Sequence, residues 1–364
     1  MKLTKWSPSL ALPVLLAAIS GTWVPVARMH SPRSGHRAAL LQDGRVLVVG
    51  GWTTRGPLKS AELFSPPAGQ WTVTGSMSLD RYATALVRLP DGRVLADGGC
   101  ISGCLAATAT AEWFDPAAGT WETTAGAMSS PRYYHSATLL QNGRVLVAGG
   151  CNASGCQTVT ATAELFDPAT GTFTPTGSLA VPRDYHTATL LPDGTVLVAG
   201  GFGYTGALNS AELYDPATGE WSTVGSMIDT RSYHAAAALP GGNVLVTGGV
   251  SANSELLATA EIYNRVTRAW SAAAPLRVAR HNHISVLLGN GKVLVAGGIG
   301  DRNQSTVSLA EAELYDSASN SWSATGHLNT GRAEFTATVL GSGAVLAAGG
   351  LGNFTQLASA ELFQ

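Results

Sequence analysis

The chain has 364 residues, of which 45% are hydrophobic, 13% are charged and 43 are glycine, and its formal net charge at pH 7 is −2. A nucleic-acid-binding surface needs a basic patch, and this charge balance argues against one. The glycine and apolar content instead indicates a compact, turn-rich protein with enough apolar material for a core.

Residues 1–20 differ from the rest of the chain. Lys2 and Lys5 precede the apolar run Leu10–Ile19, which ends among small residues. This layout is typical of a secretory signal, and the run is too short to span a membrane. We therefore expect a signal peptide, a single domain over residues 21–364, and a protein that is secreted, periplasmic or at the cell surface. The alternative is an apolar extension packed on the domain.

The four cysteines form two close pairs, Cys100/Cys104 and Cys151/Cys156. In an exported protein, local disulfides are the expected use of such pairs. The spacing within the pairs would also suit a zinc site, which is the alternative.

One unit is repeated seven times from residue 21 onward. Its clearest mark is a pair of glycines, and successive pairs lie 48 to 52 residues apart. The pairs stand at 50–51, 98–99, 149–150, 200–201, 248–249, 297–298 and 349–350. Each copy also has an arginine (Arg33, Arg81, Arg132, Arg183, Arg231, Arg280, Arg332), a glutamate after alanine (Glu62, Glu112, Glu164, Glu212, Glu261, Glu313, Glu361) and an aromatic residue (Trp23, Trp71, Trp121, Phe173, Trp221, Trp270, Trp322). Such a period predicts a repeat fold.

Each copy is expected to form four short antiparallel strands. In the third copy, the first two strands are predicted at His135–Leu140 and Arg144–Ala148, joined by the turn Asn142-Gly143. Every copy has a glycine-containing pair here, which supplies the positive φ angles of a tight hairpin. The Ala-Glu motif lies on the third strand, and a turn such as Asp-Pro-Ala-Thr-Gly leads to a fourth strand with the aromatic residue.

Seven such sheets predict an all-β, seven-bladed β-propeller with four antiparallel strands in each blade. Trp23 is a fourth-strand aromatic residue with no strands before it, whereas the last copy ends at Glu361–Phe363 without one. We therefore expect the N-terminal strand around Trp23 to complete the last blade, which would also cover the sheet edges at the seam.

Over residues 21–364 the chain resembles the kelch-repeat family. The marks of the resemblance are the glycine pair, the aromatic residue about twenty residues later and the recurring arginine, and the wording of Ala211–Gly219 is similar to bacterial members. The resemblance implies a kelch-type propeller. Because the family includes enzymes, sugar-binding proteins and protein-interaction modules, it does not imply a function.

Strand direction places the variable parts of the repeat on one face of the disc. The start of strand one and the loop between strands two and three must share that face, and these loops differ in every copy. Specificity is therefore expected there. The arginines and glutamates recur in every copy, so we expect them to be buried partners that hold strand three to the start of strand one.

Candidate binding residues gather at the start of strand one. Histidine stands there in five copies and is expected to pack and hydrogen-bond more than to bind a ligand. The preceding residue varies, and tyrosine, asparagine and glutamate there suit a sugar or a peptide, or else line a wet channel. With three loop residues, the candidates are Trp52, Tyr134, His135, Tyr185, His186, Tyr204, Tyr233, His234, Asn282, His283, Arg302 and Glu334.

One copy carries a sharper resemblance. Its Arg-Tyr-Tyr-His-Ser motif, followed by Gly-Arg-Val and a cysteine pair, is similar to a copper-binding blade of the galactose oxidase family. The resemblance implies Tyr134 and His135 as copper ligands, with the pairs at 185–186 and 233–234 as equal matches. Those enzymes also need a tyrosine cross-linked to a cysteine and a histidine from a C-terminal domain. The sequence ends at Gln364 after the last repeat, so we expect no such domain, and the paired cysteines leave no partner for the cross-link.

These observations predict a monomeric binding module for a glycan or a protein surface, with no cofactor and no catalytic residue. The competing prediction is an enzyme, first a copper oxidase and second a sugar isomerase resembling kelch-type mutarotases. Asp97 is the residue that most favours catalysis, because other copies have Val, Ala or Thr before the glycine pair. A carboxylate there could be a base with a shifted pKa, although hydrogen bonding to the backbone is the simpler interpretation.

Overall fold

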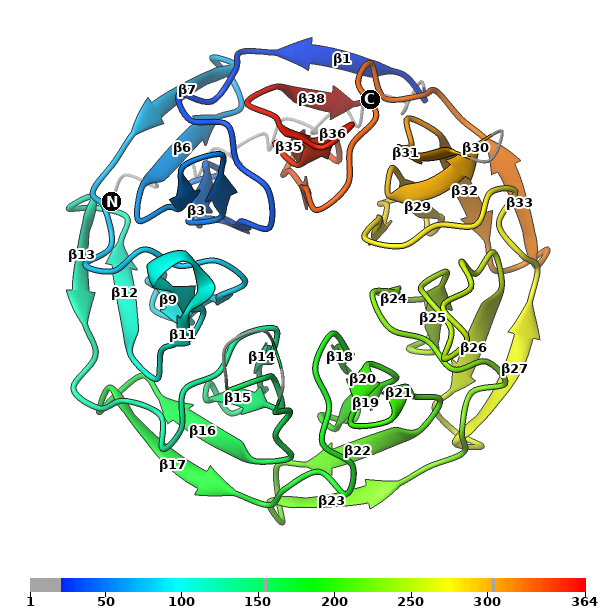
Figure 1. Cartoon of the computed structure of the whole chain (residues 1–364), viewed down its shortest axis with the longest axis horizontal. Helices are drawn as coiled ribbons and strands as arrows, with labels where there is room; N and C mark the ends of the chain where they lie inside the picture. The colour runs from blue at the N-terminus through cyan, green and yellow to red at the C-terminus, as the bar shows by residue number, and fades with distance from the viewer. Residues whose placement is uncertain (1–20, 153–155, 157, 303–304) are drawn as a thin grey trace, which may run out of the picture.

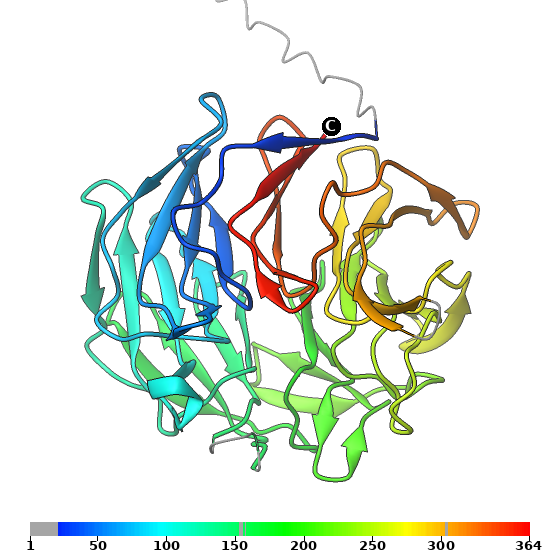
Figure 2. The ribbon, with the colours of Figure 1, turned by 45° about the horizontal axis from the view of Figure 1, so that its top comes forward.

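A computed structural model of the chain describes residues 21–152, 156, 158–302 and 305–364. The expected signal peptide therefore lies outside the described residues. Seven four-stranded antiparallel sheets surround a central channel (Figures 1 and 2), which confirms the all-β, seven-bladed propeller. The described residues contain no α-helix, and none of their elements is a helix long and apolar enough to cross a bilayer.

Each blade places its first strand at the channel and its fourth strand at the rim (Figure 1). In chain order the blades are β2 (Arg37–Leu40), β3 (Val46–Val49), β6 (Ala61–Ser65), β7 (Gln70–Val73); β8 (Ala85–Arg88), β9 (Val94–Asp97), β12 (Ala111–Asp115), β13 (Thr120–Thr123); β14 (Ser136–Leu139), β15 (Val145–Ala148), β16 (Ala163–Asp167), β17 (Thr172–Thr176); β18 (Thr187–Leu190), β19 (Val196–Ala199), β22 (Ala211–Asp215), β23 (Glu220–Thr223); β24 (Ala235–Ala238), β25 (Val244–Thr247), β26 (Ala260–Asn264), β27 (Ala269–Ala273); β28 (Ile284–Leu287), β29 (Val293–Ala296), β32 (Ala312–Asp316), β33 (Ser321–Ala324); and β34 (Thr336–Val339), β35 (Val345–Ala348), β38 (Ala360–Phe363), β1 (Trp23–Val26).

Short hairpins extend the loops between the second and third strands of several blades. They are β4 (Trp52–Thr53) with β5 (Gly56–Pro57), β10 (Cys100–Ile101) with β11 (Ala106–Ala107), β20 (Phe202–Gly203) with β21 (Gly206–Ala207), β30 (Ile299–Arg302) with β31 (Ser305–Ser308), and β36 (Leu351–Gly352) with β37 (Thr355–Gln356). One 3₁₀ turn, η1 (Ser102–Cys104), caps the β10–β11 hairpin. These hairpins lie on the face predicted to carry the variable loops.

The ring closes as the marker order predicts. Strand β1 pairs with β38, so that Trp23 lies opposite Phe363, and their ring centroids are 5.1 Å apart. Backbone bonds between Thr22 and Gln364, 3.0 and 3.1 Å long, extend the pairing by one residue. The last blade is therefore built from both ends of the described chain.

The glycine pairs join each blade to the next. The amide of the second glycine donates to the carbonyl of the next blade's recurring arginine at 2.8–2.9 Å around the whole ring, including Gly350 to Arg33. A Cβ on the first glycine would lie 2.3–2.7 Å from that same carbonyl oxygen. Both glycines also have positive φ, for example 60° and 100° at Gly200 and Gly201. Only glycine satisfies the backbone angle and the close approach together.

The recurring arginines and glutamates form one buried ion pair in each blade, as predicted. In the third blade, Arg132 donates to Glu164 Oε1 at 2.9 Å and to the Gly149 carbonyl at 2.9 Å. The equivalent ion pairs in the other blades are Arg33–Glu62, Arg81–Glu112, Arg183–Glu212, Arg231–Glu261, Arg280–Glu313 and Arg332–Glu361. Every one of these arginines is fully buried. They hold strand three to the start of strand one and take no part in the channel.

The core lies between neighbouring blades. The second strand of each blade, such as Val145–Ala148 or Val196–Ala199, is buried along its whole length because both of its faces pack against adjacent sheets. This explains the continuous apolar runs at these positions, where an alternating pattern would mark a strand with one wet face.

Candidate functional site

Seven equivalent residues, one from each blade, encircle the channel at the start of strand one. We call them the channel ring: Gly35, Ala83, Tyr134, Tyr185, Tyr233, Asn282 and Glu334. All have positive φ, between 47° and 58°. Backbone amides of the ring donate to the carbonyl of the preceding blade's ring residue, for example Tyr185 to Tyr134 at 3.3 Å and Glu334 to Asn282 at 3.1 Å. Non-glycine residues with this backbone conformation are uncommon and cluster at functional sites.

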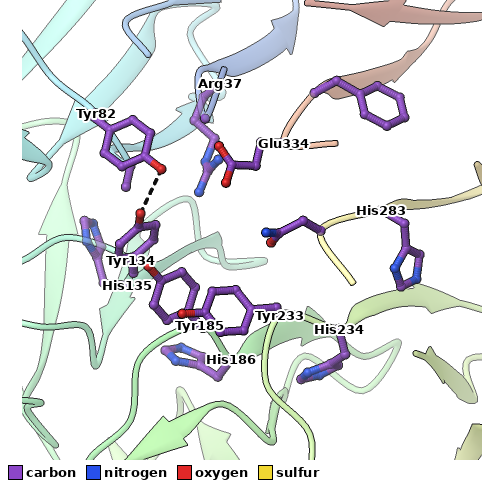
Figure 3. A pocket seen from close by; sticks show the side chains of 14 residues that line it. Arg37, Tyr82, Tyr134, His135, Tyr185, His186, Tyr233, His234, His283 and Glu334 are labelled. Carbon is purple, nitrogen blue, oxygen red and sulfur yellow. Dashed lines mark hydrogen bonds between the residues drawn. The ribbon is translucent and has the colours of Figure 1, made fainter. Parts of the chain in front are cut away.

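Four tyrosines form a continuous aromatic row on one side of the channel (Figure 3). The centroid distance is 3.8 Å from Tyr134 to Tyr185 and 3.9 Å from Tyr185 to Tyr233. Tyr82 joins the row through its hydroxyl, which accepts a 2.9 Å hydrogen bond from the hydroxyl of Tyr134. A Cβ on Gly35 would lie 2.2 Å from Tyr82 Cε2, so the missing side chain in the ring is what makes room for this tyrosine.

Two charged side chains face the tyrosine row across the channel. Figure 3 shows Arg37 and Glu334 directed toward the same space. Within the described part of the chain Arg37 forms no ion pair, and it donates only a 3.4 Å bond to the carbonyl of His36. The channel ring lines a cavity of about 250 Å³ together with Arg37, Tyr82, Phe335 and four of the strand-one histidines, His135, His186, His234 and His283.

Burial shifts the pKa values of the titratable side chains that line the cavity. It raises the pKa of Tyr82 to about 12 and the pKa of Tyr134 well above its usual value, so both hydroxyls stay protonated and able to donate. Burial also raises the pKa of Glu334, against the effect of a hydrogen bond from Ser34 and of the charge on Arg37, which lower it. The pKa of Arg37 is lowered by burial, but its guanidinium remains charged.

The strand-one histidines tie neighbouring blades together. His186 Nε2 lies 2.9 Å from Ser136 Oγ, His234 Nε2 3.0 Å from Thr187 Oγ1, and His283 Nε2 2.9 Å from Thr247 Oγ1, in each case on the preceding blade. Burial, reinforced by the charge of Arg183, lowers the pKa of His186 to about 3, so this ring is neutral at physiological pH. This geometry fits the expected role in packing and hydrogen bonding.

Asp97 also hydrogen-bonds to a strand-one histidine of the neighbouring blade. Its Oδ1 lies 2.6 Å from Nε2 of His135, and both side chains are fully buried. The backbone-bonded interpretation of Asp97 is therefore wrong: a histidine ring on the next blade is its partner. Full burial beneath the channel ring also separates this carboxylate from any ligand in the cavity.

The loop candidates are not all near the cavity. Trp52 continues the aromatic row, with its ring centroid 5.6 Å from that of Tyr82. Tyr204 is 67% exposed and donates to the carbonyl of Val159, and Arg302 is paired with Glu311, which directly precedes β32 of the same blade. Neither lines the cavity, because the β20–β21 and β30–β31 hairpins carry them outward.

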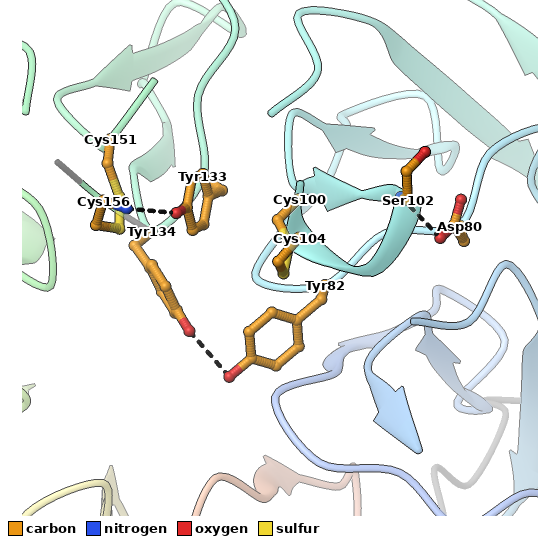
Figure 4. The surroundings of a disulfide bond; sticks show 9 residues. All are labelled: Asp80, Tyr82, Cys100, Ser102, Cys104, Tyr133, Tyr134, Cys151 and Cys156. Atoms are coloured by element: carbon orange, nitrogen blue, oxygen red, sulfur yellow. Dashed lines mark hydrogen bonds between the residues drawn. A yellow bond between two sulfur atoms is a disulfide. The ribbon is translucent and has the colours of Figure 1, made fainter. Parts of the chain in front are cut away.

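Both predicted disulfides are present, Cys100–Cys104 and Cys151–Cys156. They lie side by side on the loop face, on either side of Tyr133 and near Tyr82 and Tyr134 (Figure 4).

Three residues near the mouth were not predicted from the sequence: Arg37, Tyr82 and Asp184. The sequence comparison covered only the strand-one histidine position and the position before it. Arg37 directly follows this pair of positions in its copy, and Tyr82 directly precedes the pair in the next copy. Asp184 occupies the position equivalent to Tyr82 two copies later. Comparing all five positions from the arginine to the first strand residue would have found them, because each breaks the pattern of its column.

The residues do not fit the copper ligand set that the galactose oxidase resemblance implies. The Nε2 atoms of His135, His186 and His234 are each occupied by the preceding blade. All four cysteines are in disulfides, which leaves none for a tyrosine cross-link. Among the described residues, histidine, cysteine and acidic side chains come together closely enough for a metal only at Cys151, Cys156 and Asp184.

Comparison with known proteins places the propeller in a family. The sequence model of the KLHDC2/KLHL20/DRC7 Kelch-repeats domain matches residues 83–298 and 172–350, and that of the Kelch motif matches residues 32–78. Two galactose oxidases of Gibberella zeae are each 26% identical over 201 residues. These matches cover 50% of this chain and only 30% of the length of those relatives.

A solved structure shows the same fold. A fungal alcohol oxidase of the AA5 family, in complex with copper, superposes with a TM-score of 0.76 at 18% identity, over 95% of this chain and 76% of that one. At this identity the likeness concerns the fold alone. The family matches, by contrast, together extend over more than half of the sequence and coincide with the repeats described above. The chain belongs to the kelch-repeat family.

Proposed function

We propose that this protein is an exported binding module that holds one sugar unit of a glycan in the channel mouth. The observation that carries the proposal is the row of tyrosines, Tyr82, Tyr134, Tyr185 and Tyr233, facing Arg37 and Glu334 across one cavity. Aromatic side chains with a polar tip, set beside a few directed hydrogen-bonding groups, are the usual composition of a site for a small polar ligand.

The size of the cavity supports a single small unit. Its volume is about 250 Å³, below the range of about 300–1,000 Å³ typical of sites for drug-sized ligands. Protonated tyrosine hydroxyls can donate and accept, Arg37 offers donors only, and an ionised Glu334 offers acceptors only. This combination matches the mixed donors and acceptors of sugar hydroxyls. The two disulfides support export, because such bonds persist in oxidising compartments.

The test is a glycan array probed with the full chain, followed by calorimetry on the glycan that binds. Tyr185→Ala removes the middle of the row and is expected to weaken binding by about 2 kcal/mol or more, roughly 30-fold in Kd. Tyr204→Ala is the matched control, since its side chain is exposed outside the cavity, and should leave Kd unchanged. Denaturation midpoints of both variants separate lost binding from lost folding.

Three results would contradict the proposal. Binding that survives alanine at Tyr134, Tyr185 and Tyr233 together would show that the row is not the site. If no glycan on the array binds and a protein ligand binds at the channel mouth instead, the ligand is a protein surface and not a sugar. Stoichiometric copper in the purified protein would favour an enzyme over a binding module.

A further inference from the structure

A buried carboxylic acid lies against one of the two disulfides. Asp184 Oδ2 is 3.1 Å from Cys151 Sγ, and the two side chains come from neighbouring blades. Cys151 is completely buried and Asp184 is 1% exposed. Asp184 Oδ1 is also buried and has no hydrogen-bond partner among the described residues. A disulfide sulfur carries no hydrogen, so the contact is a hydrogen bond only when the acid itself holds the proton and donates it.

The surroundings of Asp184 favour that protonated form. Burial raises its pKa to about 7, against the lowering effect of its own backbone amide. The titratable groups that face it are Tyr133 and Tyr233, whose pKa values burial raises above 10, so both are neutral near pH 7. The adjacent Arg183 is directed into its own blade, where it pairs with Glu212 at 2.8 Å. At neutral pH the acid is therefore present both with and without its proton.

The two sulfurs differ in access. Cys156 is partly exposed and lines a hollow of about 530 Å³ whose other walls include Tyr133, Tyr134, Tyr185 and Phe202. Its backbone amide donates to the Tyr133 hydroxyl at 2.9 Å (Figure 4). Cys151 is held in backbone bridges and is covered. An incoming thiol can reach Cys156, which leaves Cys151 as the departing sulfur beside the acid.

We propose that Cys151–Cys156 is a site of thiol–disulfide exchange, open to small thiols at Cys156, with Asp184 as the proton donor to Cys151. The thiolate R–S⁻ attacks Cys156 Sγ, so that an R–S–S–Cys156 bond forms and the Cys151–Cys156 bond breaks. The electron pair of the broken bond goes to Cys151 Sγ, which takes the proton of Asp184 and becomes a thiol. A second R–S⁻ then attacks the mixed disulfide and releases R–S–S–R and the Cys156 thiolate. Two thiols are oxidised and the protein disulfide is reduced.

The chain provides its own matched control. Cys100–Cys104 occupies the equivalent loop one blade earlier, with Cys100 buried and Cys104 partly exposed in the same way. The position equivalent to Asp184 is Tyr133 there, which is a much weaker proton donor because burial raises its pKa above the usual value of 10. The two disulfides thus differ mainly in the presence of the acid.

The experiment exposes the full-length protein to reduced glutathione between pH 6 and 8.5, quenches with acid and quantifies each disulfide by mass spectrometry. We expect Cys151–Cys156 to open at least tenfold faster than Cys100–Cys104, less than the 10²–10⁴-fold of most general acid catalysis because a thiolate leaves readily. Corrected for the thiolate fraction of glutathione, its rate constant should fall as pH rises through about 7. Asp184→Asn should lower the rate to that of Cys100–Cys104 and remove the pH dependence, and glutathione should be found on Cys156.

Equal rates for the two disulfides in the unmodified protein would overturn the proposal, and this comparison needs no variant. A corrected rate constant that does not change across pH 7, or glutathione found on Cys151, would overturn it as well. If Asp184→Asn folds and its Cys151–Cys156 bond opens as fast as in the unmodified chain, the acid has no part in the exchange. None of these readouts depends on glycan binding.

Discussion

Replacing Arg280 by methionine tests whether the recurring arginines stabilise the fold. The Arg280 guanidinium is fully buried and donates to the carbonyls of Gly297 at 2.8 Å and Glu311 at 2.9 Å, and to Glu313 Oε1 at 3.1 Å. Burial lowers the pKa of Arg280 to about 10, with Glu313 opposing that effect, so the arginine is still charged at pH 7. Methionine keeps most of the aliphatic length and removes every donor.

The expected loss follows from what the substitution leaves behind. Glu313 would remain buried, and of its bonds only those from the Arg277 amide at 3.1 and 3.3 Å would persist. Removing one partner of a buried ion pair typically costs about 3–5 kcal/mol. Glu313→Gln removes the orphaned charge, so we expect Arg280→Met/Glu313→Gln to lose about 0.5–3 kcal/mol less than the sum of the two single changes.

Equilibrium unfolding in guanidinium chloride, followed by tryptophan fluorescence at pH 7, measures both quantities. Arg45→Met is the matched control, because the Arg45–Asp43 pair is also short, at 2.7 Å, but lies at the surface. That change should cost less than about 1 kcal/mol. The reasoning fails if Arg280→Met also costs less than about 1 kcal/mol, or if its loss equals that of the surface control. Ligand affinity should be the same in both variants.

Two further changes test the seam and the buried acid. Trp23→Ala removes a buried ring from the strand that closes the propeller and should cost about 3–5 kcal/mol in denaturant unfolding. The neighbouring Val24 is 43% exposed and should tolerate alanine. A loss at Trp23 as small as the loss at Val24 would mean that the seam contributes little to stability. Asp184 has a folded-state pKa of about 7 against an ordinary 3.8, so the unmodified protein should lose up to about 4 kcal/mol of stability as pH rises from 4 to 8. Asp184→Asn should remove this decline, and parallel pH profiles of the denaturation midpoint would contradict the assignment.

The fold could be predicted from the sequence because its constraints repeat. A glycine pair, a buried arginine and a rim aromatic residue appear in every copy. Comparison among the seven copies therefore separates the residues that the fold requires from those that resemble one another by chance. The ring closure followed from the same regularity, since Trp23 and Phe363 belong to one incomplete copy divided between the two ends. These recurring residues are required by hydrogen bonds and close packing between positions that lie within about fifty residues of each other in the sequence.

The candidate site was only partly predictable, because its residues meet across blades. Tyr82 reaches the channel only because the channel-ring residue of the preceding blade is Gly35, and neither position suggests this alone. The partner of Asp97 is a histidine 38 residues away. Trp52 directly follows its glycine pair, whereas Tyr204 and Arg302 stand two and three positions further along their loops and lie outside the cavity. Contacts between blades depend on side-chain reach, which a repeat alignment does not contain.

In a propeller of near-identical blades, the residues that break the repeat are the ones that need a separate explanation. Cys100, Cys151 and Asp184 all depart from their columns, and all come from three consecutive blades on one side of the channel. Arg37 and Glu334, the other departures, stand across the same opening. Stability alone would not gather these departures, because the other five blades form equally buried cores without cysteines. A ligand or a reactive thiol approaching from the loop face would meet their partly exposed disulfide partners, Cys104 and Cys156, beside the tyrosine row, so one binding event at the mouth would account for the clustering.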